Sequence, residues 1–372
     1  MEYFGEKIGK FGFGLMRLPM IGDEVDIEQT KVMADMFLKS GFVYFDTAYG
    51  YINGKSEKAI KDVLVDRYPR ESFKIATKLP AWAGPKTKEE AQQMFWTSLE
   101  RTGAGFFDFY LLHNLGEARS QFFDDYDIWN FVMDLKQKGL IKHVGFSMHD
   151  SAAELEKILI AHPEMEFVQL QINYADWESG AVESRKCLEV CQKYGKPVIV
   201  MEPVKGGSLA ALPEAAEQVL KQLDSEVSIA SWAMRFAASL EGVMVVLSGV
   251  SDIEQMQDNL NTMTNFNPLS ADEYAAIEKV QAILQSFPTV PCTSCRYCVK
   301  DCPQNIPIPT ILNAVNRVIV YGDVAPAKGN YFFATRDKGK ASDCIGCGQC
   351  EAACPQHIVI TEELQKAAAM FE

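Results

Sequence analysis

The sequence predicts a closed (β/α)8 barrel followed by a small cysteine-rich domain. Between residue 11 and about residue 262, eight short apolar segments alternate with eight segments of helical periodicity. Strands that alternate with helices form a parallel sheet, and eight such units in about 250 residues are enough to close a barrel. Beyond this region the composition changes, because eight of the ten cysteines lie between Cys292 and Cys354.

The barrel elements follow one another in a regular order. The expected strands are Phe11–Met16, Val43–Asp46, Phe73–Thr77, Phe107–Leu112, Lys142–Phe146, Phe167–Gln171, Pro197–Met201 and Val243–Leu247. The expected helices are Asp26–Ser40, Ser56–Tyr68, Thr87–Thr102, Asp124–Lys138, Ser151–Ala161, Ala181–Tyr194, Glu226–Ala238 and Ile253–Met263. An open doubly wound sheet is the alternative, but no Gly-x-Gly-x-x-Gly turn follows the first strand.

One more helix is expected after the barrel, over Ser270–Ser286. Pro288 and Pro291 then interrupt the pattern, because proline is not tolerated inside a helix. The expected domains are therefore residues 1–287 and residues 288–372.

The overall composition is that of a globular protein, with 48% hydrophobic and 23% charged residues. The formal net charge of -14 argues against a nucleic-acid partner, which would need a basic patch. No run of about 20 apolar residues is present, so no membrane span is expected. The N-terminal residues lack the pattern of a signal peptide, and the expected location is the cytoplasm.

The clustered cysteines form two quartets with the spacing C-x2-C-x2-C-x3-C-P. They are Cys292, Cys295, Cys298 and Cys302 in the first quartet and Cys344, Cys347, Cys350 and Cys354 in the second. This is the spacing of bacterial ferredoxins, in which the fourth cysteine of a quartet binds the other cluster. Zinc is the alternative, but zinc sites more often use C-x2-C pairs than such quartets.

The spacing therefore predicts a small ferredoxin-like α+β iron–sulfur domain with two [4Fe–4S] clusters. One cluster is assigned to Cys292, Cys295, Cys298 and Cys354, and the other to Cys344, Cys347, Cys350 and Cys302. The insertion Gln304–Asp343 separates the quartets. We expect a helix over Thr310–Tyr321 and an irregular stretch after it, where Gly322, Pro326, Gly329 and Gly339 occur.

Polar side chains stand at the ends of several expected strands. Asp46 ends one strand and Tyr51 lies on the loop after it, whereas Lys78, His113 and Ser147 follow the next three strands. In a barrel of parallel strands, these loops all open on the catalytic face. Each residue also has an ordinary structural alternative, as a helix cap, a core aromatic, a solvated lysine or a structural histidine. Their order along the strands favours one common site.

Together these motifs resemble the aldo-keto reductase family over about residues 8–264. The motifs are Asp46-Thr47-Ala48-x-x-Tyr51 with Ser56-Glu57, Thr77-Lys78, Leu111-Leu112-His113, Gly145-Phe146-Ser147, Gln171 and Asp258-Asn259. The cysteine-rich tail resembles the ferredoxin extension of a bacterial and archaeal branch of that family. The resemblance implies a TIM barrel and an oxidoreductase that reduces a carbonyl, or oxidises the alcohol, with NAD(H) or NADP(H).

The resemblance also implies roles for four residues. Tyr51 would be the general acid that protonates the carbonyl oxygen. Lys78 would lower the pKa of this phenol, since a nearby cation favours tyrosinate, and Asp46 would hold Lys78 in place. His113 would orient the carbonyl oxygen through a hydrogen bond.

By the same resemblance, the nicotinamide lies across the barrel mouth. Ser147 and Gln171 would hold its carboxamide, and Lys205 on the long loop Glu202–Ser225 is expected to contact the pyrophosphate. Asn259 belongs to the cofactor-binding motif after the last strand.

Family members that prefer NADPH often carry basic residues after the last strand. In this chain Gly249 and Gln255 occupy those places, and Asp252 and Glu254 would repel a phosphate. These residues argue against a strong preference for NADPH and leave the choice of nicotinamide open.

The two halves handle electrons differently, because a nicotinamide transfers two electrons as hydride and each cluster transfers one. Direct coupling needs an intermediary such as a flavin, for which no separate motif is present. The leading hypothesis is a reductase of a small carbonyl or alcohol substrate whose clusters connect it to a redox partner protein. Two alternatives stay open: an electron-transfer protein whose barrel reduces no carbonyl, and a reductase whose clusters are structural or oxygen-sensing.

Overall fold

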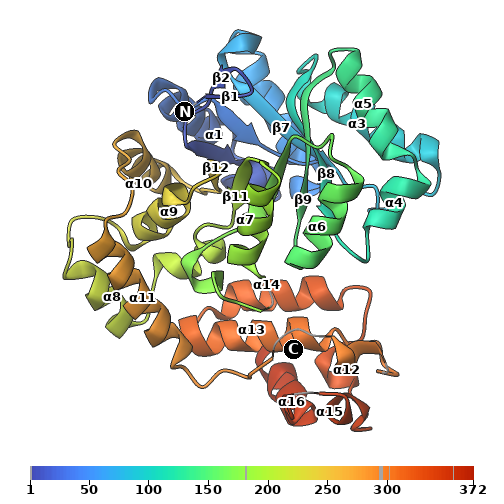
Figure 1. Cartoon of the computed structure of the whole chain (residues 1–372), viewed down its shortest axis with the longest axis vertical. Coiled ribbons are helices and arrows are strands. Elements are labelled where there is room, and N and C mark those ends of the chain that lie inside the picture. Colours follow the sequence, from blue (N-terminus) through green and yellow to red (C-terminus); the bar gives the residue numbers. More distant parts are fainter. Residues whose placement is uncertain (1, 181, 293–295, 301, 355) are drawn as a thin grey trace. The chain divides into compact units, whose positions relative to one another are not determined.

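The computed structural model describes residues 2–180, 182–292, 296–300, 302–354 and 356–372. The chain forms two compact units (Figure 1). The first unit comprises Met1–Glu178, Val182–Lys205 and Ala230–Ser270, and the second comprises Ser179–Ala181, Gly206–Ile229 and Ala271–Glu372. The expected domains, residues 1–287 and 288–372, stay a prediction. Domains defined along the sequence need not have the same boundaries as compact units in the structure.

The first unit is a closed barrel of eight parallel strands, which confirms the expected fold. The strands, in barrel order, are β3 (Phe11–Gly14), β6 (Tyr44–Asp46), β7 (Lys74–Leu79), β8 (Phe107–Leu115), β9 (Ile141–Met148), β10 (Phe167–Gln171), β11 (Val198–Met201) and β12 (Val243–Ser248). Two short hairpins precede the second barrel strand, β1–β2 (Glu2–Tyr3 and Glu6–Lys7) and β4–β5 (Met20–Ile21 and Glu24–Val25).

Helices surround the strands of this barrel (Figure 1). They are α1 (Ile27–Lys39), α2 (Lys55–Ile60), α3 (Lys88–Thr102), α4 (Ser120–Asp125), α5 (Ile128–Gln137), α6 (Ala152–Ala161), α7 (Ser184–Lys193), α9 (Ile229–Ser239) and α10 (Ile253–Thr264). Side chains cap several of them, and Asp26, Thr87, Ser151 and Asp252 each accept a backbone N–H of the first turn.

Three strands extend further than their apolar runs indicate. Lys78, His113 and Ser147 were expected just after strands, but β7, β8 and β9 include them. The backbone ladder continues through these residues, since Lys78 pairs with Leu111 and Leu115 pairs with Met148. The expected strands were too short, because each was ended before a polar residue. Inside a barrel, a polar side chain can lie within a strand if a polar partner from another strand is near.

The lower part of the barrel interior is an apolar core. Tyr44, Ala76, Leu111 and Phe167, from four different strands, belong to one buried cluster. Side chains two residues apart on a strand share a face. Asp46, Lys78, His113 and Gln169 therefore point into the same interior, one layer closer to the carboxyl ends of the strands.

The second unit is helical in its described residues. It contains α8 (Glu214–Lys221), α11 (Ala271–Gln285), α12 (Tyr297–Lys300), α13 (Ile308–Tyr321), α14 (Val324–Thr335), α15 (Gln349–Ala352) and α16 (Ile360–Phe371). A buried apolar cluster joins α13, α14 and α16. The expectation of an irregular stretch after residue 321 is wrong, because α14 forms there. Pro326 lies in the first turn of α14, where its missing N–H has no partner to lose.

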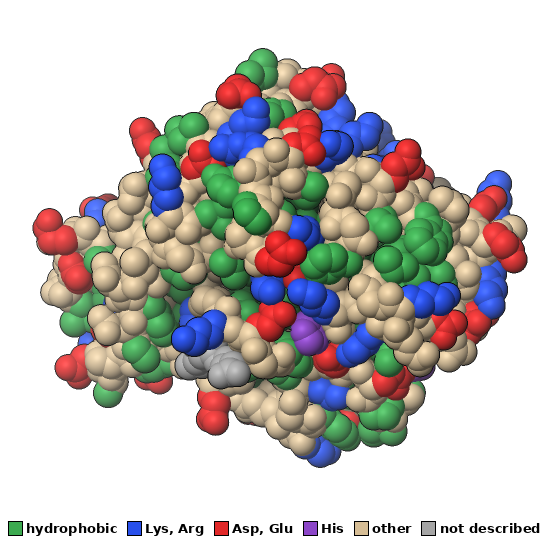
Figure 2. Space-filling view, turned by 90° about the horizontal axis from the view of Figure 1, so that it is seen from above, with side chains coloured by type: hydrophobic (Ala, Val, Ile, Leu, Met, Phe, Trp, Pro, Cys, Tyr) green, Lys and Arg blue, Asp and Glu red, His purple; other side chains and the backbone are tan. Residues whose placement is uncertain are grey.

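Acidic and basic side chains are interspersed on the face shown in Figure 2. The charges on this face therefore neutralise one another locally and do not form a field of one sign. Among the described residues, no helix is long and apolar enough to cross a membrane.

A buried carboxylate joins the amino-terminal ends of three barrel segments. Asp108, which is 1% exposed, lies 2.7 Å from Arg70 Nη2 and 3.0 Å from Lys142 Nζ. It also accepts the backbone N–H of Ile75 at 3.0 Å. Removing such a carboxylate leaves its cationic partners without compensation.

We therefore expect Asp108→Ala to lower the free energy of unfolding by about 3 kcal/mol. Glu28→Ala is the matched control, because Glu28 forms only an exposed ion pair with Lys31, and we expect it to change stability by less than about 0.5 kcal/mol. Urea unfolding at neutral pH measures both. Equal effects of the two substitutions would contradict the structural role of Asp108.

Candidate active site

The centre of the site is the Lys78 ammonium, which is 0% exposed. It donates to Asp46 Oδ1 at 2.5 Å, to the Thr47 carbonyl at 2.7 Å and to the Tyr51 hydroxyl at 3.3 Å. The structure thus brings Asp46, Tyr51 and Lys78 together around one nitrogen. The alternative roles of Asp46 as a helix cap and Lys78 as a solvated lysine do not describe these contacts.

Gln169 completes the surroundings of Asp46, and it was missed in the sequence. Its Nε2 donates to Asp46 Oδ2 at 3.2 Å from β10, which is not adjacent to β6 in the barrel. The contact therefore crosses the barrel interior. The available signal was a polar residue at an inward position of an otherwise apolar strand, where a buried amide needs a partner.

Burial and charge act in opposite directions on the pKa values of these groups. Burial alone would lower the pKa of Lys78, but Asp46 and Tyr51 outweigh it and the pKa is raised, so the ammonium stays charged. For Tyr51, burial raises the pKa more than Lys78 lowers it. Lys78 lowers the pKa of the Tyr51 phenol, as expected, but burial raises this pKa by more, so the net shift is upward.

His113 lies beside Tyr51, with ring centres 6.0 Å apart. Burial first, and then the nearby Lys78, hold the pKa of His113 well below its usual value. The imidazole is therefore neutral near pH 7. Its Nδ1 is buried and has no hydrogen-bond partner within the described part of the chain, and Trp82 Nε1 donates to the His113 carbonyl at 2.7 Å.

The side chains expected to hold a carboxamide, Ser147 and Gln171, lie on the neighbouring strands β9 and β10. Ser147 Oγ, on β9, accepts the N–H of Asn114 at 2.9 Å, which leaves its own hydrogen for another acceptor. Gln171, on β10, donates to Asp176 Oδ2 at 3.0 Å. Lys205 forms an ion pair with Asp176. Asp176, which sequence reasoning missed, thus links Gln171 and Lys205.

The residues after the last strand are engaged with one another. Gln255 donates to Asp252 at 2.7 Å and accepts the N–H of Ser251 at 3.0 Å. Asn259 is buried and donates to Ser248 Oγ at 2.9 Å. A Cβ at Gly249 would lie 3.5 Å from the stem of Arg17. Arg17, a basic residue from the loop after β3, was not identified in the sequence.

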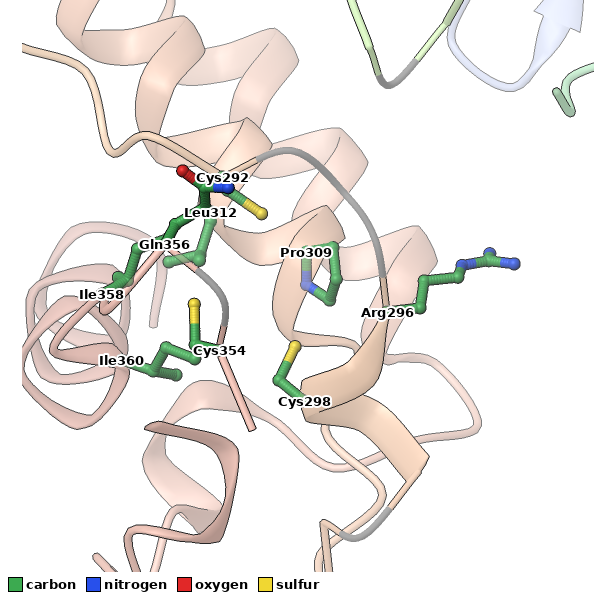
Figure 3. Close-up of a pocket in the computed structure, with 9 residues that line it drawn as sticks. All are labelled: Cys292, Arg296, Cys298, Pro309, Leu312, Cys354, Gln356, Ile358 and Ile360. Carbon is green, nitrogen blue, oxygen red and sulfur yellow. The ribbon is translucent and has the colours of Figure 1, made fainter. Parts of the chain in front are cut away.

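In the second unit, Cys292, Cys298 and Cys354 line one hollow (Figure 3). Their sulfur atoms point toward a common space, and the side chains of Pro309, Leu312 and other apolar residues surround it. Cys295, assigned to the same cluster, lies outside the described residues. Two cysteines of the first quartet therefore meet the last cysteine of the second.

A second hollow is lined by Cys302, Cys344, Cys347 and Cys350. Here the last cysteine of the first quartet meets three cysteines of the second. Among the described residues, no three Cys, His, Asp or Glu side chains converge on a single metal-ion position. Ligands of a cubane surround several iron atoms, so convergence on one point is not required of them.

Comparison with known families agrees with both units. Residues 10–282 match the aldo/keto reductase family, and residues 291–359 match the 4Fe-4S dicluster domain. Since the first match spans most of the chain, the protein belongs to the aldo/keto reductase family and is an oxidoreductase. The second match shows that it carries an iron–sulfur domain.

Individual relatives are distant. An uncharacterized oxidoreductase of Schizosaccharomyces pombe is 25% identical over 68% of this chain and 81% of its own length. An NAD(P)H-dependent D-xylose reductase of Pachysolen tannophilus is 26% identical over 51% of this chain and 62% of its own length.

Solved structures share the barrel fold. The aldo-keto reductase of Bacillus halodurans in its holo form has a TM-score of 0.60 at 23% identity, over 74% of this chain and 93% of its own. A Klebsiella pneumoniae aldo-keto reductase in complex with NADPH has a TM-score of 0.59 at 19% identity, over 74% and 91%.

The lowered pKa of His113 has a consequence for stability. The unfolded chain takes up a proton at this histidine below about pH 6.5, whereas the folded protein does not. Stability from this group is present above that pH and is lost as the pH falls. Between about pH 7.5 and pH 5.5, protonation of this histidine in the unfolded chain should lower the free energy of unfolding of the wild-type protein by up to about 1.4 kcal/mol. We expect His113→Gln to lack this part of the decrease.

Urea unfolding at the two pH values measures this difference. His162→Gln is the control, because His162 is partly exposed and stacks on Trp129 away from Lys78. An identical pH dependence in wild type and His113→Gln would show that His113 is not held neutral by its site.

Proposed function

We propose that this protein is an NAD(P)H-dependent reductase of a small carbonyl substrate, or catalyses the reverse NAD(P)-linked oxidation of the corresponding alcohol, and that it acts at Asp46, Tyr51, Lys78 and His113. The observation that carries the proposal is the position of the Lys78 ammonium. It contacts the Asp46 carboxylate and the Tyr51 hydroxyl at once inside the barrel. A phenol beside a fixed cation can lose a proton to a developing alkoxide more easily than an isolated phenol.

Each residue has one task in this proposal. Tyr51 donates its proton to the carbonyl oxygen of the substrate. Lys78 stabilises the tyrosinate that remains, and Asp46 and Gln169 keep the ammonium in position. Neutral His113 donates a hydrogen bond to the same carbonyl oxygen and so favours the charge that develops there.

The cofactor proposal depends on side chains that still have hydrogen-bonding capacity. A reduced nicotinamide, when bound, supplies the hydride. Ser147 and Gln171 would hold its carboxamide, and Asn114 Oδ1, which is buried and has no hydrogen-bond partner among the described residues, offers a further acceptor nearby. Lys205, which forms an ion pair with Asp176, would contact the pyrophosphate. Gly249, Gln255 and Asn259 would border the adenosine half, and neither NADH nor NADPH is favoured.

For the second unit we propose two [4Fe–4S] clusters that exchange electrons with a redox partner protein. The support is the crossed arrangement of the quartets, in which each hollow takes its last cysteine from the other quartet. The apolar linings are also suited to clusters that must be shielded from water. The cytoplasmic location stays a prediction. A flavin between the nicotinamide and the clusters stays a possibility that no sequence motif supports.

Removal of the Tyr51 hydroxyl tests the barrel chemistry. We expect Tyr51→Phe to lower kcat for carbonyl reduction by at least about 10²-fold, because the proton donor is lost. The dissociation constant for the nicotinamide, measured by fluorescence titration, should not change. Tyr194→Phe is the control, since its hydroxyl bonds only to Glu156 on the outside of the barrel. Undiminished reduction by Tyr51→Phe would refute the proposed site.

Single cysteine variants test the cluster assignment. We expect Cys354→Ser to disturb the cluster of Cys292, Cys295 and Cys298, and Cys302→Ser to disturb the other, because each last cysteine serves the opposite quartet. Iron content and electron paramagnetic resonance of the reduced proteins measure which signal is lost. If each variant instead loses the signal of its own quartet, the crossed assignment is wrong.

The redox state of the clusters during turnover distinguishes the alternative functions. If the iron–sulfur spectrum of the wild-type protein stays in one redox state throughout turnover, the clusters serve structure or sensing. If wild-type protein transfers electrons to a one-electron acceptor but reduces no carbonyl, the electron-transfer alternative holds.

A further inference from the structure

Arg101 and Glu57 form an ion pair directly behind the loop of Tyr51. Arg101 Nη1, from α3, lies 3.1 Å from Glu57 Oε2 and donates to the Tyr49 carbonyl at 2.9 Å. The guanidinium carbon also lies 4.4 Å from the centre of the Tyr49 ring. Glu57 is 0% exposed, so Arg101 is the charge that compensates a fully buried carboxylate.

The other oxygen of Glu57 reaches the strand of Lys78. Thr77 Oγ1 donates to Glu57 Oε1 at 2.7 Å, and Thr77 directly precedes Lys78 on β7. One carboxylate therefore connects the segment that carries Tyr51 with the strand that carries Lys78. None of these atoms touches the phenol oxygen or the ammonium.

The turn after Tyr51 has an unfavourable backbone conformation. Ile52, Asn53 and Gly54 have φ values of 49°, 55° and 82°. The left-handed conformation costs about 1–2 kcal/mol for a residue with a side chain, and it is rare for β-branched residues such as Ile52. A conformation of this kind persists only where its surroundings hold it.

Arg101 lies against this turn. A Cβ built at Gly54 would come within 2.9 Å of the guanidinium, so the backbone of Gly54 lies directly on it. Ser56 anchors the far side, through hydrogen bonds with Thr47 Oγ1 at 2.7 Å and the Leu15 carbonyl at 2.9 Å. Tyr51 is thus held between two fixed points, the Tyr49 carbonyl before it and Gly54 after it.

We propose that Arg101 is a positioning residue, which holds the left-handed turn through Glu57 and the Tyr49 carbonyl and thereby keeps the Tyr51 hydroxyl beside the Lys78 ammonium. The separation of 3.3 Å between these two groups is long for a hydrogen bond. A small outward shift of the loop therefore removes the contact. The inference rests on the proton-donor role proposed for Tyr51.

A change in the Tyr51–Lys78 contact has a signature that a general loss of stability lacks. Burial raises the pKa of Tyr51 and Lys78 lowers it, so a phenol that is displaced from both has a changed pKa. Reduction needs the protonated phenol and fails as the pH rises through that pKa. The alkaline limb of kcat should therefore move away from its wild-type pH while kcat itself falls.

Arg101→Met tests this, because it removes the donors and keeps the aliphatic stem. We expect kcat for carbonyl reduction to fall by about 10²-fold, the alkaline limb to move away from its wild-type pH, and the dissociation constant for NADH or NADPH to stay at its wild-type value. Arg101→Lys should recover part of kcat, since its ammonium can pair with Glu57. The matched control is Arg185→Met, which removes an exposed arginine paired with Glu178 and Glu189 and should leave all three quantities unchanged.

A wild-type kcat and alkaline limb in Arg101→Met, with only a lower unfolding temperature, would overturn the proposal. If Arg101→Met does not fold, Arg101→Lys provides the test, because it keeps a cation for Glu57 and removes the planar guanidinium that lies against Gly54. If the wild-type protein reduces no carbonyl, the proposed function fails, and the positioning role is then tested through the pKa of Tyr51. This pKa is measured from the pH dependence of tyrosinate absorbance, as the difference between the wild-type protein and Tyr51→Phe, and between Arg101→Met and the same variant that also carries Tyr51→Phe. A changed Tyr51 pKa in Arg101→Met supports the positioning role, and an unchanged pKa refutes it.

Discussion

The barrel site depends on one buried ammonium group. Lys78 has no exposed surface, and such a charge is tolerated only where a counter-charge and hydrogen-bond acceptors replace water. Asp46 at the end of the neighbouring strand β6, with the Thr47 carbonyl and the Tyr51 hydroxyl just after that strand, does this. The electrostatic need of Lys78 thus fixes where the phenol lies, and the phenol's chemistry follows from that position.

Compensation of buried charge also explains the contacts of the residues behind the site. Gln169 reaches across the barrel to the second oxygen of Asp46, so a rotation of that carboxylate would cost a hydrogen bond. Glu57 and Arg101 repeat the pattern on the outer side of β7, where a second buried carboxylate has its own cation. Two ion pairs on opposite faces of one strand therefore hold the loop of Tyr51, and the second of them is the basis of the positioning role proposed for Arg101.

The cysteine-rich unit follows a different physical rule. Its helices α13, α14 and α16 bury an apolar cluster. Six cysteines of the two quartets lie in or against this cluster, namely Cys292, Cys298, Cys302, Cys344, Cys350 and Cys354. Because the quartets cross, each hollow depends on cysteines from both ends of the segment.

The sequence alone determined the barrel, because the alternation of strands and helices is a local property, and it proposed Asp46, Tyr51, Lys78 and His113 as a site through a resemblance to a family. The quartets were equally local, since ligand spacing is set by the bond geometry of a cubane. Only the tertiary structure showed Gln169, Asp176 and Arg101, whose partners come from other strands or helices. It also decided that Lys78 only partly offsets the rise in the pKa of Tyr51, because burial depends on every element packed around the phenol.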